Sequence, residues 1–136
     1  MESKFCTYKR VGYFKSKMAN ILGVSYSGVI YASPGVLKHI KNRHGKQLSR
    51  KVITNILEVI KKIISEPDYI GIYKVSEGEI SIEFIKNIDM NILVGIEVDT
   101  EENYIYVSTM YPITEGKIKN KLYSGKLIEI KKLNGK

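Results

Sequence analysis

The chain has 136 residues, of which 43% are hydrophobic, and this is enough for one folded domain with a real core. Lysine and arginine total 22 and aspartate and glutamate total 14, which gives a formal net charge of +8. Such a charge attracts nucleic acid, anionic membranes or an acidic protein, and it carries no information about fold. The single cysteine, Cys6, excludes an internal disulfide and a zinc site built from several thiolates.

The sequence also lacks the signals of membrane proteins and of exported proteins. No apolar run reaches the ~20 residues of a membrane-spanning helix, and the N-terminus has no signal-peptide pattern. We therefore expect a cytoplasmic protein without membrane contact. Export by a route that needs no signal stays open.

The N-terminal region gives the weakest structural signal of the chain. Residues 1–26 mix aromatic residues and lysines, and we expect an arm or an irregular hairpin there. A strand is predicted over 27–32. The remainder, 27–136, is expected to form a single domain, because it shows neither internal repeats nor low-complexity linkers.

Two helices are predicted after this strand. Ser33 followed by Pro34 is a helix-start signal, because serine caps a helix and proline is tolerated in its first turn. This first helix is expected to run to His44, where a glycine follows. A second helix over 49–65 has apolar residues at helical spacing and ends before Pro67.

Beyond the second helix the apolar residues recur with a period of two, which is typical of strands. The turns between the strands are too short for crossover helices, so successive strands are expected to be antiparallel neighbours. We therefore predict an α+β domain in which the second helix covers one face of the sheet and leaves the other face open for binding. The strands are expected at 69–75, 80–88, 92–98 and 104–108, followed by a short basic helix at 115–123 and a strand or tail at 127–130.

The first candidate cluster contains both histidines of the chain. His39 and His44 lie in one basic segment, and histidine is the side chain whose ordinary pKa lies nearest neutrality. His39 and Arg43 are four residues apart and share a helix face. His44 borders the apolar stripe. Its alternative role is structural, because a histidine in the last turn interacts favourably with the carbonyl end of the helix. The neighbouring lysines, either phosphate-binding or part of a solvated face, are Lys38, Lys41 and Lys46.

The second candidate cluster lies at the end of the last predicted sheet strand. Alternation places Tyr104, Tyr106 and Ser108 on one face of the strand and Thr109 on the other. Tyrosines stack on bases, hydroxyls bind phosphate oxygens and lysines supply charge, which together favour a surface for single-stranded nucleic acid. The cluster is completed by Tyr111 and by the lysines beyond Pro112, namely Lys117, Lys119 and Lys121.

Motifs of other chemistries are absent from the sequence. The histidines lack the i, i+4 spacing at which a helix chelates metal, and no carboxylate accompanies them. A Walker loop, a GxGxxG fingerprint and a GxSxG elbow are all missing. We therefore expect neither a metal nor another cofactor.

The two clusters and the order of elements resemble a known superfamily. The segments 33–44 and 106–112, with a helix and a strand meander between them, look like the phage-associated nuclease domains of the barnase–EndoU–colicin–RelE superfamily. The resemblance covers roughly residues 27–125. The same order of elements is similar to RelE-type ribonucleases, although a likeness of fold does not by itself establish activity.

The resemblance implies a metal-independent ribonuclease in which a ribose 2′-hydroxyl attacks the adjacent phosphate and leaves a 2′,3′-cyclic phosphate. His39 would then be the acid or base, and Arg43 and His44 would bind or protonate the phosphate. Ser108 and Thr109 would orient or neutralise the developing oxyanion. Tyr111 and Lys117 match the pattern of the superfamily less closely. Which histidine would be the base is left open.

The leading hypothesis is thus an endoribonuclease acting on RNA, in the setting of a toxin or a mobile-element effector. An acidic immunity or antitoxin protein is a plausible partner for so basic a nuclease. A non-catalytic nucleic-acid-binding module is the second hypothesis, and it predicts salt-sensitive binding without product. A basic domain that docks on an acidic protein is the third hypothesis.

Overall fold

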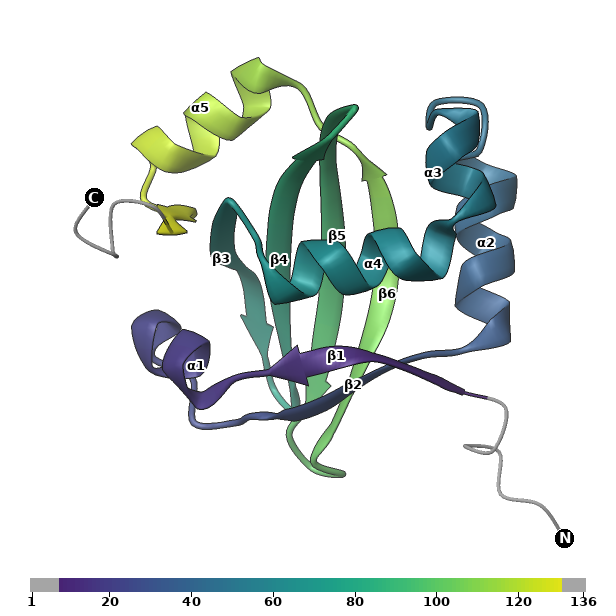
Figure 1. The fold of residues 1–136 in the computed structure, drawn as a ribbon. Helices are drawn as coiled ribbons and strands as arrows, with labels where there is room; N and C mark the ends of the chain where they lie inside the picture. The colour runs from purple at the N-terminus through teal and green to yellow at the C-terminus, as the bar shows by residue number, and fades with distance from the viewer. Residues whose placement is uncertain (1–7, 131–136) are drawn as a thin grey trace, which may run out of the picture.

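The computed structural model describes residues 8–130, so residues 1–7, with Cys6, and 131–136 lie outside the described part. Within it seven strands form one sheet in the order β1-β2-β6-β5-β4-β3-β7, accompanied by five helices. Figure 1 shows helix α4 crossing one face of the strands β4 to β6. The elements are β1 (Lys9–Phe14), α1 (Ser16–Leu22), β2 (Gly28–Ala32), α2 (Pro34–His44), α3 (Arg50–Thr54), α4 (Ile56–Ser65), β3 (Tyr69–Ser76), β4 (Glu79–Ile88), β5 (Met90–Asp99), β6 (Tyr104–Pro112), α5 (Glu115–Tyr123) and β7 (Ile128–Glu129).

The strands after α4 form the antiparallel part of the sheet. β3, β4, β5 and β6 pair with one another in chain order, as their short turns require. β2 joins this group by pairing in parallel with β6, where Tyr31 lies opposite Tyr106. The protein is therefore of mixed α+β class, and α2, which follows β2 directly, is brought alongside β6.

The N-terminal part of the structure contains regular elements that the sequence did not predict. Residues 9–22, expected to belong to an arm or irregular hairpin, instead form β1 and α1, and β1 pairs with β2. Val11 and Phe14 of β1 are 1% and 0% exposed, so burial of these two side chains ties the segment to the sheet. At the other edge β7 pairs with β3.

Helix α2 has the bounds that its sequence signals indicated. The Ser33 Oγ accepts a hydrogen bond of 3.0 Å from the backbone N–H of Val36, as an N-cap residue does. The predicted helix 49–65 is divided into α3 and α4 at Asn55, whose Nδ2 donates to the Lys51 carbonyl at 3.0 Å. Such a side-chain bond competes with the backbone pattern of a helix. None of the helices between residues 8 and 130 could span a membrane.

The main core lies between α4 and the sheet. Ile60 and Ile63 of α4 are fully buried against inward-facing strand residues such as Ile82 and Val94. A second, smaller core lies on the opposite face of the sheet beneath α5. The face that was expected to be open is therefore partly covered. The buried members of the second core are Ile85, Leu93, Ile113, Ile118 and Leu127.

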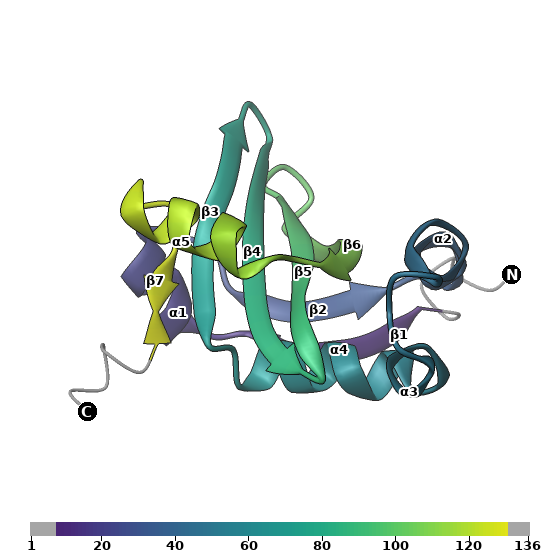
Figure 2. The ribbon, with the colours of Figure 1, turned by 90° about the horizontal axis from the view of Figure 1, so that it is seen from above.

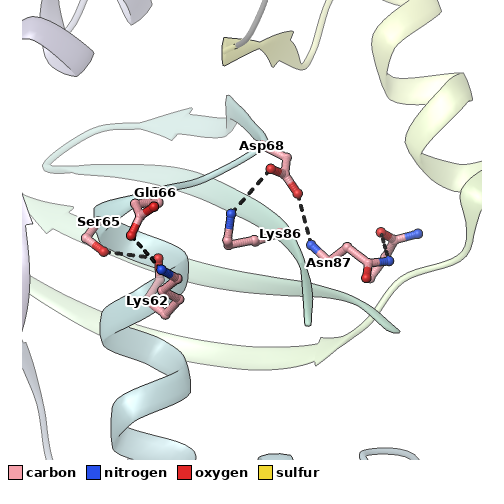
Figure 3. A network of polar contacts seen from close by, with 7 residues as sticks. Lys62, Ser65, Glu66, Asp68, Lys86 and Asn87 are labelled. Carbon is pink, nitrogen blue, oxygen red and sulfur yellow. Dashed lines mark hydrogen bonds and ion pairs between the residues drawn. The ribbon is translucent and has the colours of Figure 1, made fainter. Parts of the chain in front are cut away.

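Polar contacts fix the junction between α4 and the sheet, as Figure 3 shows. The Lys62 Nζ lies 2.7 Å from the Glu66 carboxylate at the end of α4. Just beyond Pro67, the Asp68 carboxylate accepts a hydrogen bond of 3.0 Å from the backbone N–H of Asn87. The Asp68 contact joins the segment after α4 to strand β4.

Candidate active site

The C-terminal half of α2 packs beside the end of β6. The rings of His44 and Tyr111 have their centroids 5.6 Å apart. Val36 of α2 and Ser108 of β6 line the same pocket, which has a volume of about 390 Å³. The two clusters that are distant in the sequence therefore lie next to each other at one edge of the sheet.

A second pocket, of about 370 Å³, opens on the part of the sheet that α5 leaves uncovered. Ser108 lines this pocket as well as the one beside α2, so the two pockets adjoin. We call this second pocket the sheet pocket. Its lining comes from four neighbouring strands and comprises Tyr73, Lys74, Glu79, Ser81, Glu83, Gly95, Ile96, Glu97, Ser108, Thr109 and Tyr111.

A β-bulge brings both predicted hydroxyls into the sheet pocket. In the pairing of β5 with β6, Gly95 lies opposite Thr109 and Ile96 lies opposite Val107, which leaves Ser108 as the extra residue. Such a bulge shifts the alternation of a strand by one position. The prediction that Ser108 and Thr109 face opposite sides was therefore wrong, because it assumed an unbroken period of two.

Gly95 forms part of the floor between the two hydroxyls. A Cβ at this position would lie 2.9 Å from the Thr109 Cγ2 and 3.5 Å from the Ser108 Oγ. The Ser108 hydroxyl donates to the Gly95 carbonyl at 3.2 Å. A side chain at residue 95 would thus occupy the space that the pocket uses.

Glu97 is the central carboxylate of the sheet pocket. The Ser81 Oγ donates to it at 2.6 Å and the Ser108 Oγ lies 3.5 Å from its other oxygen. Burial raises the pKa of Glu97 above its usual range, and the nearby Glu79 raises it further, while the serine hydrogen bonds act in the opposite direction. A carboxylate of raised pKa in a pocket is typical of a proton-transfer group.

A buried ion pair links α5 to the pocket. Glu83 is only 6% exposed, and the Lys121 Nζ lies 2.8 Å from its carboxylate. The same ammonium group lies 5.3 Å from the centroid of the Tyr73 ring. Lys121 therefore joins α5 to the sheet, and its charge compensates one of the pocket carboxylates.

The two tyrosines predicted to bind substrate are both half-buried. The Tyr106 hydroxyl donates to the Glu79 carboxylate at 3.2 Å. Burial, together with Glu79, raises the pKa of Tyr106 to about 12, so its hydroxyl stays protonated at neutral pH. Burial likewise raises the pKa of Tyr111, with a smaller contribution from Glu83.

The remaining predicted residues of α2 are divided between two sides of the helix. His39 and Arg43 are exposed, and they follow Val36 by three and seven residues, so they share its side of the helix, but neither side chain lines the pocket. His44 is half-buried, and its Nδ1 lies 3.0 Å from the Gln47 Oε1. The exposed lysines at 38 and 41 follow Val36 by two and five residues, so they lie on other sides of the helix.

Apart from the half-buried Lys121, the predicted lysines outside α2 are exposed. Lys46 follows α2, and Lys117 and Lys119 belong to α5. Figure 2 shows α2 next to β6 on one side of the molecule and α5 over β3 and β4 on the other. The two basic helices thus flank the uncovered part of the sheet rather than forming one continuous patch.

Sequence reasoning missed the carboxylates of the sheet pocket. Glu97 and Glu79 have the alternating positions of ordinary solvated strand residues, and only the strand register brings Ser81 opposite Glu97. Between residues 8 and 130, no group of three histidine, cysteine, aspartate or glutamate side chains is arranged to hold a metal ion.

Comparison with known families agrees with this architecture. Residues 9–120 match the family model described as phage-Barnase-EndoU-ColicinE5/D-RelE like nuclease3, so the chain belongs to this nuclease family. The match begins at β1 and therefore includes the segment that sequence reasoning set aside as an arm. No curated protein and no solved structure matches the chain.

Proposed function

We propose that the protein is a metal-independent endoribonuclease whose reaction takes place in the sheet pocket, at its border with α2. The observation that carries the proposal is the half-buried Glu97, which is held by two hydroxyls in a pocket beside a helix bearing His44 and Arg43. Membership of a nuclease family supplies the class of reaction. RNA as the substrate, and the mechanism below, are parts of the proposal.

Glu97 is proposed as the general base. Its carboxylate removes the proton from a ribose 2′-hydroxyl, and the resulting oxygen attacks the adjacent phosphorus. Ser108 lies 3.5 Å from the carboxylate and presents its hydroxyl where charge develops on the phosphate oxygens. Thr109 lines the same pocket and is assigned the same supporting role.

An imidazolium of α2 is proposed as the general acid. As the bond from phosphorus to the 5′-oxygen breaks, this oxygen takes up a proton, leaving a 2′,3′-cyclic phosphate and a free 5′-hydroxyl. His44 is the preferred proton donor because its ring lies beside Tyr111 of the pocket. His39 is the alternative donor. Arg43, on the same side of α2 as Val36, supplies positive charge to the phosphate.

The test is cleavage of a labelled RNA oligonucleotide in excess EDTA. We expect wild type to cleave it and to leave a 2′,3′-cyclic phosphate, whereas a strand with a deoxyribose at the cleaved position stays intact. Ser108→Ala should lower kcat about 100-fold, the effect of removing one donor to a developing oxyanion. Ser25→Ala, which changes an exposed loop serine, should not alter kcat.

Three outcomes of this assay would contradict the proposal. Cleavage that stops in EDTA would contradict metal independence. Equal activity of wild type and Ser108→Ala would show that the reaction does not take place in the sheet pocket. RNA binding without any product would instead support a non-catalytic binding module. The acidic inhibitor partner stays a prediction.

A second prediction concerns the floor of the pocket. Gly95→Ala should lower RNA cleavage at least tenfold, because the new Cβ would lie 2.9 Å from the Thr109 Cγ2 and force Thr109 to shift beside Ser108. The matched control is Gly116→Ala, since a Cβ at Gly116 meets nothing within 4 Å. The measurement is the RNA cleavage rate of both variants, with thermal melts to verify that each is folded. Equal rates would show that the space beside residue 95 is not used.

A further inference from the structure

A third pocket lies toward the start of β6, away from the reaction centre proposed above. It has a volume of about 840 Å³, within the range of about 300–1,000 Å³ that is usual for ligand sites. Tyr31, Tyr104 and Tyr106 all line it, and we call it the tyrosine pocket. The proposed chemistry makes no use of Tyr31 or Tyr104.

The three tyrosine rings form a continuous aromatic surface. The centroids of Tyr31 and Tyr104 are 5.7 Å apart with the rings inclined by 24°. Those of Tyr104 and Tyr106 are 5.4 Å apart with an inclination of 21°. Tyr104 and Tyr106 alternate on β6, and Tyr31 is held beside them by the parallel pairing of β2 with β6. The sheet thus fixes the stack before any ligand binds.

The charges around the stack are negative. Asp99 and Glu102 line the pocket together with the amide of Asn103, and within the described chain its lining contains neither lysine nor arginine. The Asp99 Oδ1 is held in place because it accepts the backbone N–H groups of Glu101 and Glu102 at 3.1 and 3.0 Å. Carboxylates repel a phosphate, but they accept hydrogen bonds from the amino groups of bases. The pocket therefore suits an uncharged aromatic group that donates hydrogen bonds.

The tyrosine pocket is connected to the proposed reaction centre. Tyr104 and Tyr106 also line the pocket beside α2, and that pocket contains Ser108. Ser108 follows Tyr104 by four residues along the strand, which corresponds to about 14 Å. A ligand that extends along β6 would therefore place one group at Ser108 and another on the tyrosine stack.

We infer that the tyrosine pocket is a subsite for a nucleobase of single-stranded RNA, belonging to a nucleotide near the one whose phosphate is cleaved. The inference rests on the proposed function for the identity of the substrate. The base stacks on the Tyr31–Tyr104–Tyr106 surface, and the phosphates follow the basic side of α2. Stacking of this kind binds single strands without requiring a particular base.

The test uses a 2′-O-methyl RNA oligonucleotide, which cannot undergo 2′-hydroxyl attack, with 2-aminopurine placed at successive positions. The fluorescence of 2-aminopurine falls when it stacks. We expect wild type and Tyr31→Phe to quench one position strongly, and Tyr31→Leu to quench it little and to bind about tenfold more weakly. Tyr104→Leu and Tyr104→Phe form a second pair should Tyr31→Leu fail to fold.

The matched control is Tyr123→Leu, which changes a tyrosine that is 96% exposed on α5. It should bind as wild type does. The slope of log Kd against log salt should be the same for wild type and Tyr31→Leu, because the tyrosine ring carries no charge and neutralises no phosphate. A smaller slope in Tyr31→Leu would indicate that one phosphate fewer is bound and would overturn the inference, as would binding by wild type without quenching at any position. Since no cleavage is measured, failure of the nuclease proposal would be seen separately, in the EDTA assay.

Discussion

Replacing Glu97 with glutamine should lower the rate of RNA cleavage about 1,000-fold, the middle of the range for loss of a general base. Glutamine keeps the shape of the side chain and can still accept a hydrogen bond from Ser81, but it cannot take up a proton from a 2′-hydroxyl. The rate is measured with saturating oligonucleotide, so that kcat is separated from KM. Glu58→Gln, on the exposed side of α4, is the control and should cleave as wild type does.

The pH dependence of cleavage gives an independent check on this role. The pKa of Glu97 is raised by burial, so the active carboxylate form appears only as pH rises beyond the ordinary value of 4.5. We expect kcat/KM of wild type to rise as pH increases from 4.5 through the raised pKa of Glu97. The pH profile of Glu97→Gln should lack this rise. A rising limb that persists in Glu97→Gln would assign the base to another group.

Stability should change with pH in the opposite direction. Because the folded state holds the Glu97 proton more tightly than the unfolded state, this residue's contribution to stability is present at low pH and falls as pH rises from 4.5 through the raised pKa. Urea unfolding of wild type and Glu97→Gln over this range measures the difference. Glutamine should be favoured increasingly as pH rises, which would show that the ionised form of Glu97 costs stability.

The helix that carries His44 was predictable because its signals are local. Ser33 and Pro34 mark its start, and the stripe of Val36 and Ile40 gives its period, so α2 has the predicted bounds. The division of the next helix was not predictable from its apolar pattern, because that pattern continues unbroken across Asn55. Asn55 has non-helical backbone angles there, with φ −115° and ψ 37°, and its side-chain amide donates to the Lys51 carbonyl.

The candidate site was only partly predictable, for a different reason. Spacing along one element made Arg43 and His44 candidates, and a strand-end pattern made Ser108 one, and their roles stay predictions. The surroundings of Glu97 depend on residues of the two neighbouring strands β4 and β6, and a one-residue change in register would turn its side chain to the other face. The bulge at Ser108 is such a change, and no feature of the sequence marked it.

The buried pair of Lys121 and Glu83 gives the largest expected effect on stability. Lys121→Met keeps most of the side-chain volume but leaves the Glu83 carboxylate, 6% exposed, without its charged partner. Removal of one member of a buried ion pair should reduce the free energy of unfolding by about 3 kcal/mol. Urea unfolding at neutral pH measures this change. Lys119→Met, on the exposed side of the same helix, should change it by less than about 0.5 kcal/mol.

The double variant Lys121→Met/Glu83→Gln separates charge from packing. If the loss in Lys121→Met comes from an uncompensated carboxylate, replacing Glu83 with neutral glutamine should restore most of the stability. If it comes from loss of the contact between the Lys121 ammonium and the Tyr73 ring, the double variant should be no more stable than Lys121→Met. Equal unfolding midpoints for Lys121→Met and Lys119→Met would instead mean that α5 is held by Ile118 and its apolar neighbours alone. The ion pair would then serve the charge balance of the pocket rather than the docking of the helix.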